Sequence, residues 1–232
     1  MLTLKVIGSG SKGNGYLLRN ERGNTLILEC GMPLIETKKA LGFDLSSLDG
    51  IYLSHGHSDH IGHLSEYELI GADIFAPYES DKEIVRRRMG AFDISAFRLP
   101  HGEINSYGAF IRDVLSGETV IFCTDFEFCK YTFRNKSVNH FIVECNYQDE
   151  YVDLDAVNKA HKLGGHCSLK TCKNFIKANI TPSMKSVILI HMGMTSTNPR
   201  ECIAEIAEVV PPNVSVDYAR QGETYELATK CF

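Results

Sequence analysis

One stretch of the chain decides its interpretation: residues 50–60 read GIYLSHGHSDH. The apolar run at residues 50–53 is typical of a short buried strand, and a polar loop follows it at once. Imidazole nitrogens and carboxylate oxygens are ligands that zinc and similar divalent ions accept. A chain of this composition matches H-x-H-x-D-H by chance on the order of once in a thousand cases, so the motif is specific. The sequence therefore predicts a metal site that includes His55, His57, Asp59 and His60.

Three further residues of ligand type stand where predicted strands end. His101, Asp125 and His191 each follow an apolar, strand-like run. Strand ends are where α/β folds collect chemistry, because the loops there are free of packing duties. Each of the three alone is more often structural. Beside the motif at residues 55–60, we expect all three at the metal site.

The remaining sequence predicts hairpins first and then strands that alternate with helices, in two similar halves. This order indicates an α/β fold, a four-layer αββα sandwich of two mixed β-sheets with outer helices. We expect residues 1–232 to form one domain. The predicted strands are 2–7, 15–18, 25–29, 50–53, 73–77, 109–115, 119–123, 141–144, 187–191, 214–218 and 224–227, and the predicted helices are 34–41, 80–89, 154–163, 169–178 and 199–210.

Composition narrows the classes of partner. The 232 residues are 44% hydrophobic and carry a net charge of −5, which argues against strong nonspecific binding to nucleic acid. Eight cysteines without a CxxC pair suggest reduced thiols rather than a disulfide framework. The sequence shows no membrane-spanning apolar run and no signal peptide at its N-terminus. We therefore expect a cytoplasmic protein with no membrane partner.

These motifs together resemble a metallo-β-lactamase-fold hydrolase, over nearly the whole chain. The Gly-rich turn at residues 8–15 and the following residues 25–31 are similar to the family's opening hairpins. The resemblance implies two divalent metal ions, zinc first and manganese as the alternative. It places the first ion on His55, His57 and His101, the second on Asp59, His60 and His191, and Asp125 as a bridge between them.

Two positions compare informatively with the family. Glu29 stands where the family usually has an aspartate that orients a metal ligand, and its extra methylene is expected to shift the surroundings of that ligand. His57 stands where the di-iron redox branch carries a glutamate. Histidine at this position favours zinc-type hydrolysis over iron redox chemistry.

A second pair of residues resembles the RNase Z-like phosphodiesterase branch. Glu144 ends the predicted strand 141–144, and His166 lies in the turn 164–168, read GGHCS, before a predicted helix. The resemblance implies that His166 is the general acid and Glu144 its orienting partner, with Asp59 as the third catalytic residue. An imidazole suits this role because its pKa lies near neutrality. The simpler alternatives are a helix-entry histidine and a buried ion-pair partner.

The chain resembles the compact members of this branch. The domain that long nuclease relatives insert between residues 126 and 190 is absent, and no counterpart of the tRNA-clamping arm is evident. Compact exonuclease-like bacterial proteins and phage-encoded cyclic-nucleotide phosphodiesterases are similar. We therefore expect a binuclear phosphodiesterase that acts on a small nucleotide or short oligonucleotide through a metal-bridging hydroxide. The resemblance also suggests a homodimer. The alternatives are an exonuclease on longer DNA or RNA, an acyl or lactone hydrolase, and a non-enzymatic binding protein.

Overall fold

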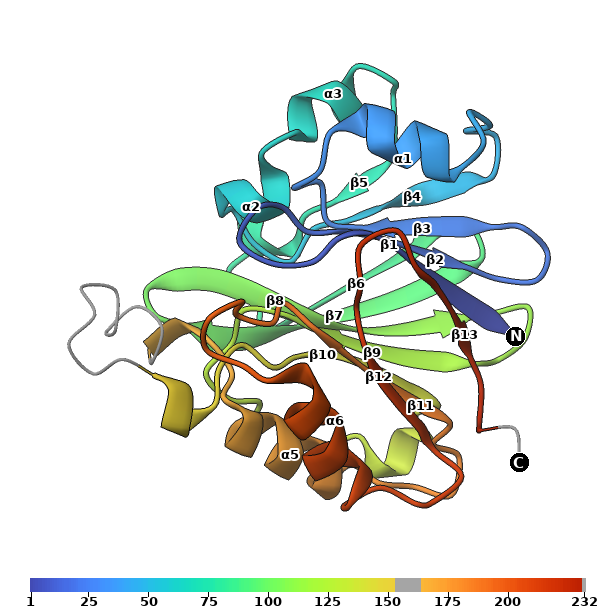
Figure 1. The fold of residues 1–232 in the computed structure, drawn as a ribbon. Helices are drawn as coiled ribbons and strands as arrows, with labels where there is room; N and C mark the ends of the chain where they lie inside the picture. The colour runs from blue at the N-terminus through green and yellow to red at the C-terminus, as the bar shows by residue number, and fades with distance from the viewer. Residues whose placement is uncertain (153–163, 231–232) are drawn as a thin grey trace.

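Two mixed β-sheets lie face to face, with helices on both outer faces (Figure 1). The computed structural model describes residues 1–152 and 164–230. The predicted four-layer α/β arrangement is confirmed. The helix predicted at residues 154–163 lies outside the described residues.

The first sheet contains the N-terminal strands and one C-terminal strand. Its order is β13-β1-β2-β3-β4-β5, and β13 returns from the end of the chain to pair antiparallel with β1. The last strands thus join the two sheets, because β12 belongs to the second one. The strands are β1 (Leu2–Gly8), β2 (Gly15–Arg19), β3 (Thr25–Leu28), β4 (Leu48–Tyr52), β5 (Ile74–Phe75) and β13 (Thr224–Leu227).

The second sheet has the order β12-β11-β10-β9-β8-β7-β6. The pairs β9–β10, β10–β11 and β11–β12 are parallel. The pairs β6–β7, β7–β8 and β8–β9 are antiparallel. The strands are β6 (Ile84–Met89), β7 (Phe92–His101), β8 (Ile104–Asp113), β9 (Thr119–Cys123), β10 (His140–Glu144), β11 (Ser186–Ile190) and β12 (Ser215–Tyr218).

Helices cover the outer face of each sheet. Leu34 and Tyr67, from α1 and α3, pack in one apolar cluster with residues of the first sheet. Phe175 of α5 and Ile206 of α6 pack in another cluster against the second sheet. The helices are α1 (Leu34–Ala40), α2 (Ser58–Ile61), α3 (Leu64–Glu68), α5 (Leu169–Ala178) and α6 (Pro199–Ala207), with short 3-10 turns η1 (Pro77–Glu79), η2 (Arg134–Lys136) and η3 (Asp149–Tyr151).

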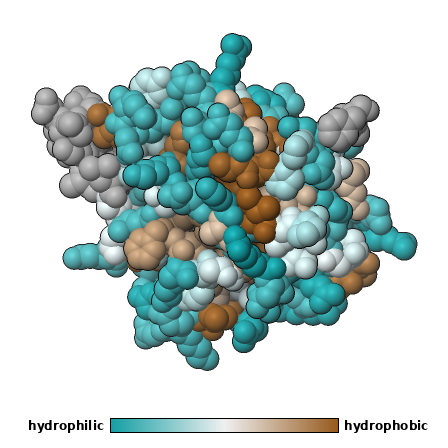
Figure 2. All heavy atoms as spheres, turned by 90° about the horizontal axis from the view of Figure 1, so that it is seen from below, coloured by the Kyte–Doolittle hydropathy of each residue, from teal (hydrophilic) through white to brown (hydrophobic). Residues whose placement is uncertain are grey.

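The face that carries α5 and α6 is mostly hydrophilic, with a hydrophobic strip near its centre (Figure 2). Among the described residues, no helix is both long and apolar enough to cross a membrane.

Strand β9 shows why the two sheets stack. All five of its residues are buried. Because side chains alternate along a strand, Val120 and Phe122 point into the layer between the sheets, and Ile121 and Cys123 point toward α5 and α6. A strand covered on both faces needs apolar residues throughout, and the sequence Thr-Val-Ile-Phe-Cys provides them.

The helix predicted at residues 80–89 is wrong. Ile84–Met89 forms strand β6, which pairs antiparallel with β7 through a tight turn at Gly90, where φ is +51°. The helical interpretation considered only local composition, and pairing with β7 overrides it. Arg86, Arg87 and Arg88 are exposed on an edge strand, where charged side chains discourage pairing with another chain. The strand predicted at residues 73–77 is also shorter, because Pro77 begins η1.

Phe122 is the side chain that most directly joins the two sheets. Its ring packs edge-on against Tyr16 of β2 at 6.0 Å and Tyr52 of β4 at 6.2 Å between ring centroids. We predict that Phe122→Ala lowers the free energy of unfolding by about 3–5 kcal/mol, because a buried aromatic ring is lost and a cavity remains. Urea unfolding followed by circular dichroism measures this change. Leu69→Ala, at a side chain that is 88% exposed, serves as the control, and a Phe122→Ala loss no larger than the Leu69→Ala loss would contradict the prediction.

Candidate metal centre

Three neighbouring parallel strands end at the same edge of the second sheet. Glu144 is the last residue of β10, His191 follows β11 directly, and Asp125 comes two residues after the end of β9. Asp125 and His191 have φ values of +47° and +49°, which non-glycine residues seldom adopt. Such backbone conformations are found at functional sites, where surrounding contacts hold them in place. Here they let two polar side chains turn inward immediately after buried strands.

The facing sheet and a long hairpin supply the histidines. The motif loop leaves β4, and its last residues form the one-turn helix α2, whose N-cap is His57. His101 ends β7. Residues that lie far apart in the sequence therefore meet between the open ends of the two sheets.

The predicted ligands form two clusters that share one carboxylate. The first cluster is His55, His57, His101 and Asp125, and the second is Asp59, His60, Asp125 and His191; the possible ligand atoms within each lie within 4.8 Å of one another. Asp125 Oδ2 lies 3.7 Å from His55 Nε2 and 3.9 Å from His101 Nε2. Asp125 Oδ1 lies 2.8 Å from His191 Nδ1 and 3.4 Å from His60 Nε2. One carboxylate oxygen thus serves each cluster.

The chemistry of the clusters fits divalent cations. His191 Nε2 is buried, has no hydrogen-bond partner among the described residues and lies 3.4 Å from Asp59 Oδ2 of the second cluster. A buried ring nitrogen without such a partner is costly unless another group, such as a metal ion, meets it. Burial, followed by the charge of His60, lowers the pKa of His55 to about 2, so its imidazole is neutral, as a metal ligand must be. Burial opposes charge on His60 and His191 as well, but Asp125 raises the pKa of both, so an ion bound at the second cluster would displace their protons. Seven residues with nitrogen or oxygen donors, grouped in two clusters that share Asp125, fit two ions.

His166 and Glu144 adjoin both clusters. The Glu144 carboxylate is fully buried, and His166 Nδ1 lies 2.7 Å from its Oε1. Its Oε2 accepts hydrogen bonds from the Phe126 and Cys167 backbone N–H groups. Burial and the Asp125 charge favour protonated Glu144, but the hydrogen bonds of His166 and His191 and the charge of His166 together lower the Glu144 pKa. Burial opposes charge on His166, yet the bond to Glu144 raises the His166 pKa.

A cavity of about 810 Å³ opens onto these residues. Asp59, Asp125, His166 and His191 lie on its lining. Its other walls come from the Gly-rich loop, from residues 192–195 and from Gln221. Residues 8–113 match the Metallo-beta-lactamase superfamily. The fold of the chain is the metallo-β-lactamase fold. Members of this superfamily are metal-dependent, usually with two metal ions.

Known proteins similar to this chain include phage proteins and compact solved structures. The anti-Pycsar protein Apyc1 of Bacillus phage 010DV004 is 39% identical over 74 residues, which span 29% of each chain. The metallo-β-lactamase-fold protein YhfI from Bacillus subtilis is 19% identical, with a TM-score of 0.72 over 97% of this chain and 98% of that one. The short form of human tRNase Z is 15% identical, with a TM-score of 0.64 over 97% and 99%. The likeness to these two structures concerns the fold alone.

Glu29, the departure from the family pattern, still reaches the site. Its carboxylate is fully buried and accepts the Ser54 backbone N–H at 3.1 and 3.3 Å. One oxygen lies 3.5 Å from His60 Nδ1. Glu29 adopts a φ of +71°, so a turned backbone accommodates the longer side chain. Ser54 Oγ in turn lies 2.9 Å from His55 Nδ1, so this contact pair holds one histidine of each cluster.

Sequence analysis missed Asn14 as a residue of this metallo-β-lactamase site. The buried Asn14 amide donates to Asp59 Oδ2 and to the Asp59 carbonyl, both at 3.3 Å, and lies 3.0 Å from His60 Nε2. Its Oδ1 accepts the Gly10 N–H at 2.9 Å and the Tyr16 hydroxyl at 3.2 Å. Asn14 therefore fastens the Gly-rich loop to two residues of the second cluster. The available signal was an asparagine between Gly13 and Gly15, in a loop otherwise made of small residues.

We predict that Asn14→Ala weakens binding of the more weakly held metal ion by about 10–100-fold, because Asp59 loses the donor that orients it. Competition with a chromophoric chelator measures the affinity. Asn20→Ala is the matched control: Asn20 is also buried and also donates to an aspartate, Asp113, at 3.0 Å, but it lies outside the two clusters. Equal zinc affinities in Asn14→Ala and Asn20→Ala would show that Asn14 does not position a ligand.

Proposed function

We propose that the protein is a phosphodiesterase that uses two divalent ions to hydrolyse small nucleotides, with cyclic nucleotides as the first candidate substrate. The observation that carries this proposal is the hydrogen-bonded pair of His166 and Glu144 beside both clusters. Glu144 Oε1 also lies 3.1 Å from His191 Nδ1, but acyl and lactone hydrolysis does not explain why this buried carboxylate holds His166 as well. Phosphodiester hydrolysis does, because its leaving alkoxide needs a proton.

In this proposal the first cluster holds one ion and the second cluster the other, with Asp125 between them. Zinc is the expected metal because imidazole nitrogens dominate the donor set, and manganese is the alternative. When bound, two such ions supply an activated water nucleophile and offset negative charge on the phosphoryl oxygens. Asp59 contributes as a ligand whose position Asn14 fixes.

His166 supplies the proton in this proposal. Its Nδ1 hydrogen points at Glu144 Oε1, and this bond fixes the ring orientation and leaves Nε2 to hold the transferable proton. The His166 side chain is 11% exposed, so it is held firmly but still reaches the cavity. Glu144 acts through His166 and is a positioning residue. The buried backbone N–H groups of Phe126 and Cys167 hold Glu144 in turn.

The cavity and the charge favour a small substrate. A volume of about 810 Å³ lies within the usual range for small-molecule sites. Among the described residues that line the cavity, Lys12 is the one lysine or arginine. With a net charge of −5, the chain offers little to hold a long polyanion. The anti-Pycsar relatives match over less than a third of their length, and they favour cyclic nucleotides as the substrate class.

A substrate panel tests the proposal. The zinc- and manganese-loaded protein is assayed against 3′,5′- and 2′,3′-cyclic nucleotides, single-stranded DNA, RNA, a thioester, a lactone and a β-lactam. We expect turnover of cyclic nucleotides well above that of every other class. Dominant turnover of DNA or RNA would replace the small substrate with an exonuclease function. Turnover of only the acyl compounds, or of none with both metals bound, would overturn the proposal. Light scattering tests the predicted homodimer.

We predict that His166→Ala lowers kcat on a cyclic nucleotide by about 10²–10⁴-fold, the usual contribution of a general acid. The loss on bis(p-nitrophenyl) phosphate is expected to be much smaller, because its leaving group departs without a proton. His63→Ala is the control, since His63 also pairs with a glutamate, Glu66, at 2.7 Å, but outside the two clusters. Equal losses on both substrates would show that His166 does not protonate the leaving group.

A further inference from the structure

The loop that follows His191 is held rigidly beside the cavity. The His191 backbone N–H donates to Ser9 Oγ at 2.9 Å, and the Asn146 amide donates to the His191 carbonyl at 3.0 Å. The Gly193 N–H donates to the Asn146 carbonyl at 2.9 Å, and its own carbonyl accepts the Thr197 hydroxyl at 2.8 Å. A Cβ at Gly193 would overlap Asn146, so the chain needs glycine there. Residues 192–195 are therefore fixed in place at the cavity wall.

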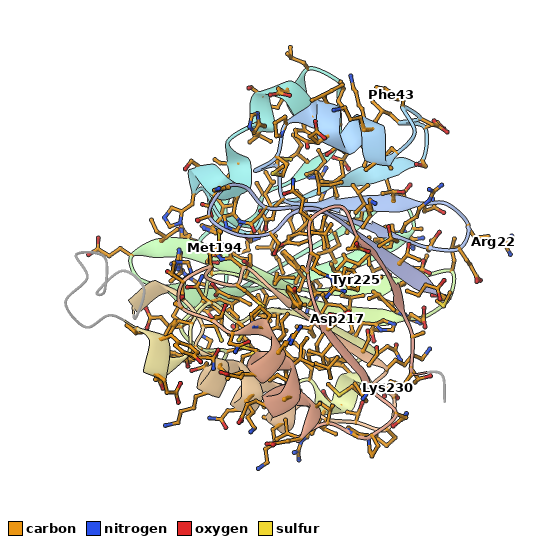
Figure 3. All side chains as sticks on the ribbon, viewed as in Figure 1. Arg22, Phe43, Met194, Asp217, Tyr225 and Lys230 are labelled. Atoms are coloured by element: carbon orange, nitrogen blue, oxygen red, sulfur yellow. The ribbon has the colours of Figure 1, made fainter. Side chains whose placement is uncertain are left out.

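Methionine is concentrated around this cavity. Three of the six methionines in the chain line it. Met32 has a packing role, because its side chain fills the space where a Cβ on Gly8 or Gly13 would lie. Met192 lies partly against the second apolar cluster, and Met194 is 87% exposed. Met194 projects at the same side of the molecule as α2 (Figure 3). The exposed, unbranched apolar side chain of Met194 therefore contributes little to the stability of the fold.

We propose that Met192 and Met194 form the subsite for the nucleobase of the substrate, an inference that rests on the proposed function. The two side chains share the cavity lining with Asp125, His166 and His191, so a nucleotide whose phosphate lies at the metal clusters has its base within the same cavity. Thioether sulfur makes favourable contacts with aromatic rings, and the flexible methionine side chain adapts to rings of different shape. The occupant is the flat face of a purine or pyrimidine ring.

The subsite contacts the flat face of the base and does not discriminate the pattern of hydrogen-bond donors and acceptors along its edge. Thr195 and Gln221 are exposed polar side chains that line the same cavity. The Gln221 amide offers both a hydrogen-bond donor and an acceptor. A rotatable amide matches more than one base edge. All four common bases are therefore substrates, and purines bind somewhat better than pyrimidines because their rings present more surface. Lys12, on the Gly-rich loop, supplies positive charge for the phosphate end.

Calorimetric titration of the zinc-loaded protein tests the subsite without turnover. The probes are AMP and ribose 5-phosphate, which differ by the base alone. We expect AMP to bind about tenfold more tightly, as a ring contact of ordinary strength predicts. In the double variant Met192→Ala/Met194→Ala, the ratio of the two Kd values is expected to fall to about twofold or less, with the Kd of ribose 5-phosphate unchanged. Met194→Leu, which keeps an apolar side chain, is expected to retain part of the ratio.

Leu69→Ala is the matched control, because Leu69 is another apolar side chain that is 88% exposed but does not line the cavity. It should keep the wild-type ratio. A wild-type ratio near one, or a full ratio in the double variant, would overturn the subsite even in an active phosphodiesterase. A normal ratio that depends on Met192 and Met194, in a protein that hydrolyses no phosphodiester, would instead overturn the proposed function and leave the subsite standing.

Discussion

At the end of β9, one buried carboxylate faces histidines of both clusters. Asp125 lies within 4 Å of ring nitrogens of His55, His60, His101 and His191, and the Thr124 hydroxyl donates to its Oδ1 at 2.8 Å. Burial favours the protonated acid, but the charges of His191 and His60 hold its pKa well below the usual value. A buried anion without such partners would destabilise the fold by several kcal/mol. The surrounding strands are positioned so that their ends enclose the Asp125 carboxylate.

The architecture meets that need by combining a buried scaffold with turned loop ends. Strands β9, β10 and β11 are completely buried and parallel, so their carboxyl ends stay together. Contact of the two sheets through Phe122, Tyr16 and Tyr52 brings the motif loop after β4 to the same edge. The polar side chains of the site then lie at the strand ends and on the loops there, which have no packing role. Asn14 and Glu29 connect the outermost ligands back to these elements.

The sequence predicts which histidines and aspartates come together in two clusters, for a physical reason. The motif residues are almost consecutive, so their meeting depends on one loop, and Asp125 and His191 end apolar runs that could only be buried strands. Local composition predicts a helix at residues 84–89. These residues form a strand instead, because they pair with β7, and local composition does not indicate that pairing. Asn14 went unrecognised because its contact with Asp59 spans 45 residues, and an amide has no metal-binding signature. The exposure of Met194 depends on how loop 191–197 is braced, which no sequence pattern indicates.

The central claim is that Asp125 joins two metal sites, and a metal count on an isosteric variant tests it most directly. Metal-free wild type and Asp125→Asn are dialysed against zinc, and bound zinc per chain is measured by mass spectrometry, with circular dichroism as the check on folding. The account predicts two zinc ions in the wild type, and one or none in the variant. Two tightly bound ions in folded Asp125→Asn, or a wild type that binds fewer than two, would contradict it.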